Sequence, residues 1–208
     1  MLDNKNHHKE RLPNYQVSKE CKGIAVDLGV AIGEFSKKHS EQFDFIYGFE
    51  PVYTNMVRAI YNTRKCDNVM ILPLALSHTP LDIITMKSTG QNLYSYTSDV
   101  TPEIRDFKYG HTSPASNETQ TIFGINLENI LKLTGGKINY LKSDCEGAEL
   151  CLLDDELVQH IDYIGMEVHP FIYGEGNLKK LSNFFSKYFD GNFDNKRMWY
   201  LKNKKLNK

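Results

Sequence analysis

Apolar runs alternate with amphipathic segments along most of the chain. Continuous apolar runs predict strands that are buried on both faces, and they lie at 23–29, 43–51, 68–77, 138–147 and 161–170, with a last strand at 196–203. Between them, apolar residues recur at helical spacing, which predicts helices at 34–42, 52–63, 125–136, 148–159 and 176–191. This alternation predicts an α/β fold with a mostly parallel twisted sheet, helices on both faces and a final antiparallel strand.

The apolar faces of two helices can be named from the spacing. In the helix at 52–63 the apolar positions are Met56, Val57 and Ile60. In the helix at 176–191, five apolar side chains fall on one face: Leu178, Leu181, Phe184, Phe185 and Tyr188. We expect these faces to cover the sheet.

Three segments depart from the alternation. Pro73 interrupts the third strand, which places that strand at a sheet edge or at a bulge. Residues 80–88 read as a further extended piece, and 88–120 shows little periodicity and much Ser, Thr, Asn and Tyr. Long polar segments of this kind in a compact domain are typical of lids, so we expect a substrate lid at 88–120. We expect 1–20 to be a polar leading segment and 21–208 to form a single domain.

Composition limits the possible partners and cellular compartment of the protein, but it does not indicate a function. The net charge is −1, so no field of one sign draws the protein to nucleic acid or to an anionic membrane, and neither is expected as a partner. No apolar run reaches the length of a membrane span. The four cysteines are isolated, with no metal-ligand spacing, which is typical of reduced thiols and favours a cytoplasmic protein.

The turn after the first strand carries the first specific signal. The strand ends in Asp27, Gly29 opens the turn, and Gly33 precedes the next helix. Glycines let a ligand approach the backbone, and the helix start presents free N–H groups. A dinucleotide fingerprint has three glycines, whereas this turn has two and an acid ahead of them. An acid repels phosphate but suits a cationic amine and sulfonium, so the turn indicates S-adenosylmethionine.

A second acid stands where a nucleoside ribose would lie. Glu50 ends the second strand, about 20 residues beyond Asp27, which is the spacing at which an acid accepts hydrogen bonds from both ribose hydroxyls.

More charged residues cluster at the ends of the later strands. Asp144 and Glu146 lie two apart at the end of the fourth strand, and Glu167 and His169 lie two apart at the end of the fifth. Residues two apart in a strand share a face, so these four side chains should converge near Asp27 and Glu50. Glu149 falls in a first helical turn, where we expect it to cap the helix.

The ordered motifs "VDLGVAIGEFS", "FEP", "LALS", "LKSDCEGAEL" and "MEVHP" resemble the FkbM family of S-adenosylmethionine-dependent methyltransferases over residues 23–170. The resemblance implies a Rossmann-like class I methyltransferase fold and O-methylation of a sugar, glycolipid, polyketide or similar natural product. It places Asp27, Gly29, Gly33, Glu50, Pro51, Ala75 and Asp144 at the cofactor. The family usually has Ala-Asn where this chain has Val30-Ala31, which removes one side-chain hydrogen bond near the cofactor.

Methylation of a hydroxyl requires a base, and His169 is the first candidate, followed by Asp144, with Glu146 beside them. The neighbouring carboxylates Asp144, Glu146 and Glu167 should raise the pKa of His169, because they favour its cation. A metal ion held by Asp144, Glu146 and His169 is the alternative, but no compact ligand motif supports it, so no metal is expected.

Two other classes of function remain open. An NAD(P)-dependent oxidoreductase would share the fold, and Tyr61 and Lys65 have the spacing of a hydride-transfer pair, although they follow the second strand. A non-catalytic cofactor-binding or interaction protein is the other reading, supported by Val30-Ala31. For the methyltransferase, the hydroxyl-rich composition of 88–120 suits a small-molecule or glycan acceptor.

Overall fold

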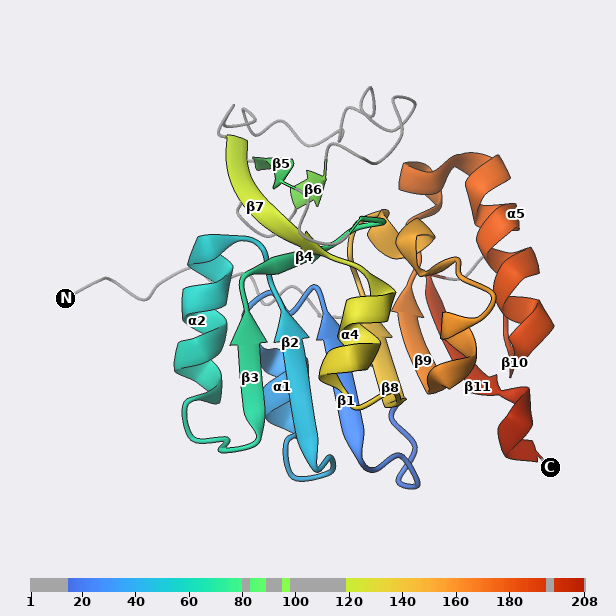
Figure 1. Ribbon diagram of the computed structural model, residues 1–208, viewed down its shortest axis with the longest axis horizontal. Helices are drawn as coiled ribbons and strands as arrows, with labels where there is room; N and C mark the ends of the chain where they lie inside the picture. The colour runs from blue at the N-terminus through green and yellow to red at the C-terminus, as the bar shows by residue number, and fades with distance from the viewer. Residues whose placement is uncertain (1–14, 80–82, 89–94, 98–118, 194–196, 208) are drawn as a thin grey trace.

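A computed structural model describes residues 15–79, 83–88, 95–97, 119–193 and 197–207 (Figure 1). Its main element is a seven-stranded sheet in the order β10-β11-β9-β8-β1-β2-β3. Neighbours are parallel among β1 (Ile24–Leu28), β2 (Phe45–Phe49), β3 (Val69–Leu72), β8 (Ile138–Ser143) and β9 (Ile161–Glu167). Strand β11 (Met198–Asn203) runs antiparallel to both β9 and β10 (Phe189–Gly191). The predicted sheet and its antiparallel last strand are confirmed, while the short β10 was not predicted.

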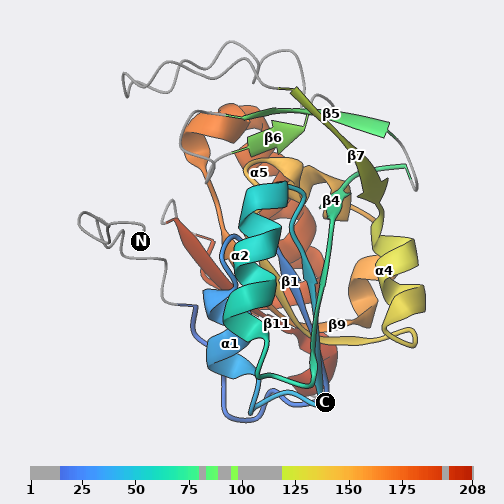
Figure 2. The same cartoon turned by 90° about the vertical axis from the view of Figure 1, so that its left-hand side faces the viewer.

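Helices cover both faces of this sheet, as predicted (Figure 2). Helices α1 (Glu34–His39) and α2 (Tyr53–Thr63) lie on one side, and α4 (Leu127–Leu133) lies on the other. Helix α5 (Pro170–Tyr188) packs into the same apolar core as α4, and the short 3-10 helix η3 (Lys204–Asn207) ends the described chain. Within the described residues, no helix combines the length and the apolar composition that crossing a membrane requires.

The apolar core divides into two clusters, one on each face of the sheet. The larger cluster contains Val26 and Leu28 of β1 together with residues of α4 and α5. The smaller one contains Ala25 of β1. It also includes Tyr15, whose ring meets Phe35 of α1 edge to face at a centroid distance of 5.8 Å. Tyr15 therefore belongs to the packed core, although it lies in the segment expected to be polar.

A second sheet lies above the carboxyl ends of the central strands (Figure 1). Pro73 separates β3, an edge strand of the main sheet, from β4 (Leu74–Leu76), which joins the second sheet in the order β4-β7-β5-β6. Its other strands are β5 (Ile83–Ser88), β6 (Ser95–Thr97) and β7 (Thr119–Ile125). The third strand lies at a sheet edge, as expected, but it ends at Leu72, so the prediction of one strand through residue 77 is wrong. Most of the expected lid at 88–120 lies outside the described residues, but β6 and the start of β7 are strands that the sequence did not predict.

The predicted helix at 148–159 is wrong. The segment forms two 3-10 helices, η1 (Ala148–Leu152) and η2 (Leu157–His160). Between them, the Asp154 carboxylate accepts hydrogen bonds from the backbone N–H groups of Glu156 and Leu157, at 3.0 and 2.9 Å. An Asp side chain that captures nearby N–H groups competes with helical hydrogen bonding, which explains the interruption.

The predicted buried face of α2 is also wrong. Val57 and Ile60 are 45% and 47% exposed, whereas Ala59 and Thr63 are buried. The reason is the close approach of α2 to the glycine turn: a Cβ atom at Gly33 would lie 3.1 Å from the Ala59 Cα. Only small side chains fit at that contact. The predicted face of α5 is confirmed, since its central apolar residues are buried in the core.

Candidate functional site

The glycine turn after β1 lies against the exit of β8. The Gly29 N–H donates to the Phe49 carbonyl at 3.0 Å, and a Cβ atom at Gly29 would lie 1.9 Å from the Asp144 carbonyl oxygen. Gly29 has a φ of 73° and Gly33, at the start of α1, a φ of 85°. Both positions need glycine, because other residues rarely adopt this left-handed conformation. The turn is therefore held tightly between β2 and β8.

Asp27 is fully buried beneath this turn rather than open to a ligand. One carboxylate oxygen accepts a hydrogen bond from the Ser36 hydroxyl at 2.6 Å, and the other lies 3.1 Å from the Lys142 ammonium. Lys142 also donates to the carbonyls of Leu28, at 3.2 Å, and Gly29. Asp27 and Lys142 thus fix the shape of the turn from below.

Lys142 is a residue that the sequence analysis missed. It is the next-to-last residue of the largely buried strand β8, directly across from Asp27 in the register of β8 and β1. Its side chain is only 5% exposed. A lysine inside a strand that is buried on both faces needs a charged partner. A lysine in a predicted buried strand was therefore the sequence feature that could have indicated the pair with Asp27.

Glu50 joins the glycine turn to the start of α2. One carboxylate oxygen accepts from the Ala31 N–H at 2.7 Å and the other from the Val52 N–H at 2.9 Å. The residue is 4% exposed. Burial raises the pKa of Glu50 to about 7, against the opposing effect of these two hydrogen bonds. Pro51 lies between the two segments that Glu50 connects.

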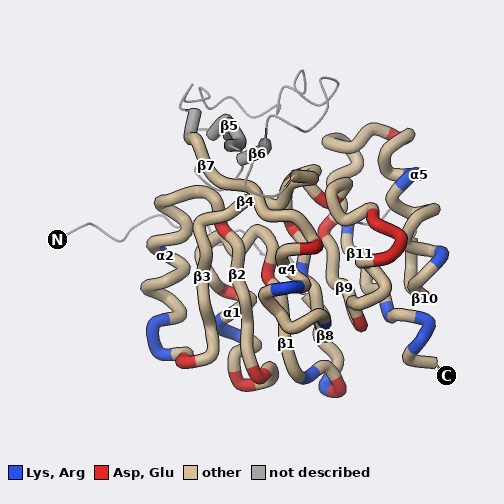
Figure 3. The backbone as a smooth tube through the Cα atoms, in the orientation of Figure 1, with Lys and Arg blue, Asp and Glu red and all other residues tan. Residues whose placement is uncertain are grey.

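The four predicted charged residues beyond β8 and β9 do come together. The two strands are paired so that Ser143 faces Met166, and Asp144 and Glu167 therefore leave the sheet side by side. The Nε2 atom of His169, at the start of α5, lies 3.5 Å from a Glu167 oxygen and 3.7 Å from a Glu146 oxygen. Figure 3 shows positions of Asp and Glu residues, in red, at the upper ends of the central strands. We call Asp144, Glu146, Glu167 and His169 the mouth cluster.

Burial and mutual repulsion shift the pKa values in the mouth cluster. Burial lowers the pKa of His169, but the hydrogen bond to Glu167 and the charges of Glu146, Glu149 and Asp144 outweigh it and raise the pKa to about 9. The direction expected from the sequence is confirmed. Burial is also the largest cause of the raised pKa values of Asp144, to about 6, and Glu146, to about 7. The cluster holds more negative charge than its cations neutralise.

Three of these side chains lie close enough together to hold a metal ion. Ligand atoms of Asp144, Glu167 and His169 all lie within 4.8 Å of one another. The metal set weighed as an alternative from the sequence was Asp144, Glu146 and His169, without Glu167. Two carboxylates and an imidazole are donors that a divalent cation accepts.

Glu149 supports the loop that carries this cluster. One of its oxygens accepts from the Cys145 N–H at 2.6 Å, and the other accepts from the Gly147 N–H at 3.0 Å and from the Tyr173 hydroxyl of α5. The residue is fully buried. Glu149 therefore holds the loop before η1, rather than capping an α-helix as the sequence led us to expect.

Three other residues considered from the sequence, Ala75, Tyr61 and Lys65, do not belong to the mouth cluster. Ala75 is buried in β4 of the second sheet. Tyr61 lies near the end of α2 and is 64% exposed, with the Arg64 guanidinium 3.9 Å from its ring centroid, and the exposed Lys65 follows that helix. Tyr61 and Lys65 therefore have no place in a hydride-transfer site at the carboxyl ends of the strands.

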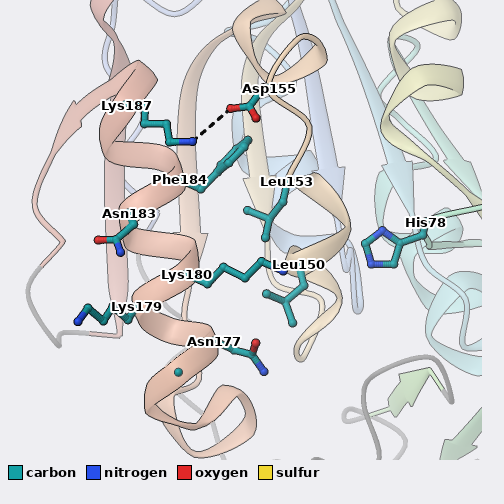
Figure 4. Close-up of a pocket in the computed structure, with 11 residues that line it drawn as sticks. His78, Leu150, Leu153, Asp155, Asn177, Lys179, Lys180, Asn183, Phe184 and Lys187 are labelled. Atoms are coloured by element: carbon teal, nitrogen blue, oxygen red, sulfur yellow. Dashed lines mark ion pairs between the residues drawn. The ribbon is translucent and has the colours of Figure 1, made fainter.

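A groove runs between α5 and η1 (Figure 4), with a volume of about 710 Å³. Leu150, Leu153 and Phe184 give it apolar walls, and Lys180 reaches across it from α5. At one end Lys187 pairs with Asp155 at 3.5 Å. The helix and the 3-10 helix that border the groove begin directly after the two loops of the mouth cluster.

The chain matches the family described as the methyltransferase FkbM domain over residues 27–202. That range includes the glycine turn, Glu50 and the whole mouth cluster. A search of curated proteins finds no match.

Solved structures add a likeness in fold. An rRNA methylase from Streptococcus thermophilus has a TM-score of 0.50 and 8% identity, with 88% of this chain and 87% of that chain covered. Fibrillarin, a pre-rRNA processing protein of Methanococcus jannaschii, has a TM-score of 0.47 and 8% identity, with 90% of this chain and 68% of that chain covered. At these identities the likeness concerns the fold alone.

Proposed function

Since the chain belongs to the FkbM methyltransferase family and has a Rossmann-like class I fold, we propose that it transfers a methyl group from S-adenosylmethionine to a hydroxyl of a sugar, glycolipid or related natural product. The observation that carries this proposal is the convergence of the glycine turn, Glu50 and the mouth cluster at the carboxyl ends of β1, β2, β8 and β9. Open α/β sheets bind their ligands at that edge.

The residues at this edge suit a cofactor without phosphate. Gly29 and Gly33 leave the backbone open to close approach, and each Glu50 oxygen keeps a further lone pair for a ribose hydroxyl beside its present hydrogen bond. Pro51, Ala75 and Asp144 complete the cofactor positions that the family motifs imply, and Asp27 acts on the cofactor through the turn that it holds. When bound, the cofactor supplies an electrophilic methyl group on a sulfonium.

The mouth cluster supplies the chemistry on the acceptor side. A hydroxyl is a weak nucleophile, so its proton has to leave as the oxygen attacks the methyl carbon. His169, Asp144 and Glu146 are the groups that carry this step. Two routes use them: His169 takes the proton directly, with Asp144 as the second candidate base, or a bound cation acidifies the hydroxyl.

The acceptor that we propose is a small molecule or a glycan. The groove beside α5 offers apolar walls and lysines to the part of such a molecule that does not react. The rRNA methylase with a similar fold makes RNA the competing acceptor to test, although its 8% identity carries no inference about substrate.

Calorimetry with ligands of each class tests the proposal. We expect S-adenosylhomocysteine to bind and NAD⁺ and NADPH not to bind. Glu50→Ala should weaken binding of S-adenosylhomocysteine by about 1–3 kcal/mol, because the ribose hydroxyls lose a buried acceptor, whereas exposed Lys65→Ala should leave it unchanged. Labelled S-adenosylmethionine offered with glycans, small metabolites and RNA then identifies the acceptor. Binding of a dinucleotide in place of S-adenosylhomocysteine would contradict the proposal.

A further inference from the structure

We propose that Asp144, Glu167 and His169 bind one divalent cation at the mouth of the site, and that this cation holds and acidifies the acceptor hydroxyl. The catalytic part of this inference rests on the proposed function, whereas the binding of the cation does not. Nothing in the sequence motifs assigns a metal to these residues.

The donors converge because of the register of the sheet. Asp144 and Glu167 leave the adjacent parallel strands β8 and β9 side by side, and His169 follows two residues after Glu167. All three ligand atoms lie within 4.8 Å of one another. An octahedral ion with bonds of ~2.1 Å spaces its neighbouring donors roughly 3 Å apart. Small side-chain rotations therefore bring the set into coordination distance.

Groups around the three donors hold them in orientation. The exposed Arg197 guanidinium forms an ion pair with a Glu167 oxygen, and Glu146 lies 3.7 Å from the His169 Nε2 atom. Outer partners of this kind fix the direction of ligand side chains in metal sites. Arg197 directly precedes β11, and its carbonyl accepts from the Val168 N–H at 2.6 Å, which holds it beside the end of β9.

Two buried polar atoms beside the donors have no hydrogen-bond partner among the described residues. One is the His169 Nδ1 atom, and the other is the hydroxyl of Tyr15. Tyr15 is 7% exposed, and its hydroxyl lies close to the Asp144 carboxylate without the geometry of a normal hydrogen bond. Buried polar atoms are almost always paired, so two unpaired atoms at one place are consistent with a ligand bound there. A cation with its coordinated water would give both atoms a partner.

The donor chemistry favours a cation of the Mn²⁺ type. Carboxylates suit Mg²⁺ and Mn²⁺, and the imidazole shifts the preference from Mg²⁺ toward Mn²⁺. With three protein ligands, coordination positions remain for the oxygens of an acceptor. Two hydroxyls on neighbouring carbons of a sugar would fit such a site.

In the methyl transfer, the cation acts on the acceptor oxygen. The acceptor oxygen, acidified by the cation, forms a bond to the methyl carbon, and the carbon–sulfur bond breaks with its electron pair left on sulfur. The hydroxyl proton is released to the solvent. The positive charge of the sulfonium is lost and one proton is released, so charge is conserved.

Titration of the full-length protein with Mn²⁺, followed by electron paramagnetic resonance, tests the inference without any turnover. We expect one ion to bind per chain. Glu167→Gln and Asp144→Asn should each weaken binding at least tenfold, while the matched control Glu128→Gln, on the exposed face of α4, should leave it unchanged. The two cluster variants report independently, so the failure of one to fold does not remove the test.

No binding by the wild type up to millimolar Mn²⁺, or equal affinity in the wild type and both cluster variants, would overturn the inference. Calorimetry with S-adenosylhomocysteine in the presence of a chelator separates this result from the proposed function. If S-adenosylhomocysteine binds but Mn²⁺ does not, only the cation fails and His169 acts as the base. If Mn²⁺ binds but S-adenosylhomocysteine does not, the proposed function fails, and the catalytic role of the cation fails with it.

Discussion

Ala31 occupies a backbone conformation that suits a different residue. Its φ of 50° is in the left-handed region, and its N–H is held by Glu50 at 2.7 Å. Alanine in this region costs roughly 1 kcal/mol, whereas asparagine is tolerated there. The family usually has asparagine at this position, so the departure that the sequence analysis treated as a lost hydrogen bond is also a source of local strain.

Ala31→Asn should therefore stabilise the protein by about 0.5–1 kcal/mol, because it relieves the left-handed alanine. Thermal unfolding measures the change. Ala59→Gly, inside α2, is the matched control and should destabilise, since glycine is poor in a helix and Ala59 is packed. A lower melting temperature for Ala31→Asn would show that the conformation of the turn is not strained.

Glu50 should make cofactor binding depend on pH. Its pKa is raised to about 7, mainly by burial. Above pH 7 the carboxylate is ionised and accepts from ribose hydroxyls; below pH 7 it takes up a proton and loses acceptor capacity. The affinity for S-adenosylhomocysteine should thus fall with decreasing pH, by up to about tenfold per pH unit below the pKa. Glu50→Gln should bind more weakly and lose this dependence, which calorimetry at several pH values detects.

At the scale of elements, the sequence predicted the features that depend on the spacing of apolar residues. The strands of the main sheet and the face of α5 followed from continuous or regularly spaced apolar residues. The predictions failed where a single contact decided the outcome. The Asp154 side chain accepts hydrogen bonds from two backbone N–H groups and so interrupts an expected helix. The close contact at Gly33 places the small Ala59, rather than Ile60, against the glycine turn.

The site was predictable to the same extent. The convergence of Asp144, Glu146, Glu167 and His169 followed from alternation in paired strands, and the structure confirms it. The burial of Asp27 could not be deduced from its own position, because it depends on Lys142 in a strand more than 100 residues later. A local sequence pattern does not show which distant residue will pair with a given side chain.

Lys142 should be essential to the element formed by β1 and its turn. Lys142→Met leaves the Asp27 carboxylate buried without its cation, which should cost about 3–5 kcal/mol of unfolding free energy. Adding Asp27→Asn should recover part of the loss. Lys132→Met, which removes an exposed pair with Glu128, should cost at most about 0.5 kcal/mol. Urea denaturation compares the variants, and a small effect of Lys142→Met alone would contradict this view of the turn.

At the scale of the whole molecule, the residues proposed to bind the cofactor and those proposed to act on the acceptor lie on different strands of the main sheet. The glycine turn and Glu50 lie on β1 and β2, while the mouth cluster lies on β8 and β9. His169→Ala should accordingly keep the affinity for S-adenosylhomocysteine and lose turnover by about 10²–10⁴-fold, whether the imidazole acts as base or as cation ligand. Single-turnover kinetics and calorimetry measure the two quantities. His160→Ala, at the exposed end of η2, is the control, and turnover within a few-fold of wild type in His169→Ala would remove His169 from the reaction.

The central claim is that the turn from Asp27 to Gly33 binds S-adenosylmethionine. Titration of ¹⁵N-labelled protein with S-adenosylhomocysteine, followed by amide signals, tests it most directly. The account predicts saturable shifts at Gly29, Ala31 and Gly33, and at Val52, whose N–H shares the Glu50 carboxylate with Ala31. Saturable shifts confined to other parts of the chain, or no shifts at millimolar ligand, would contradict it.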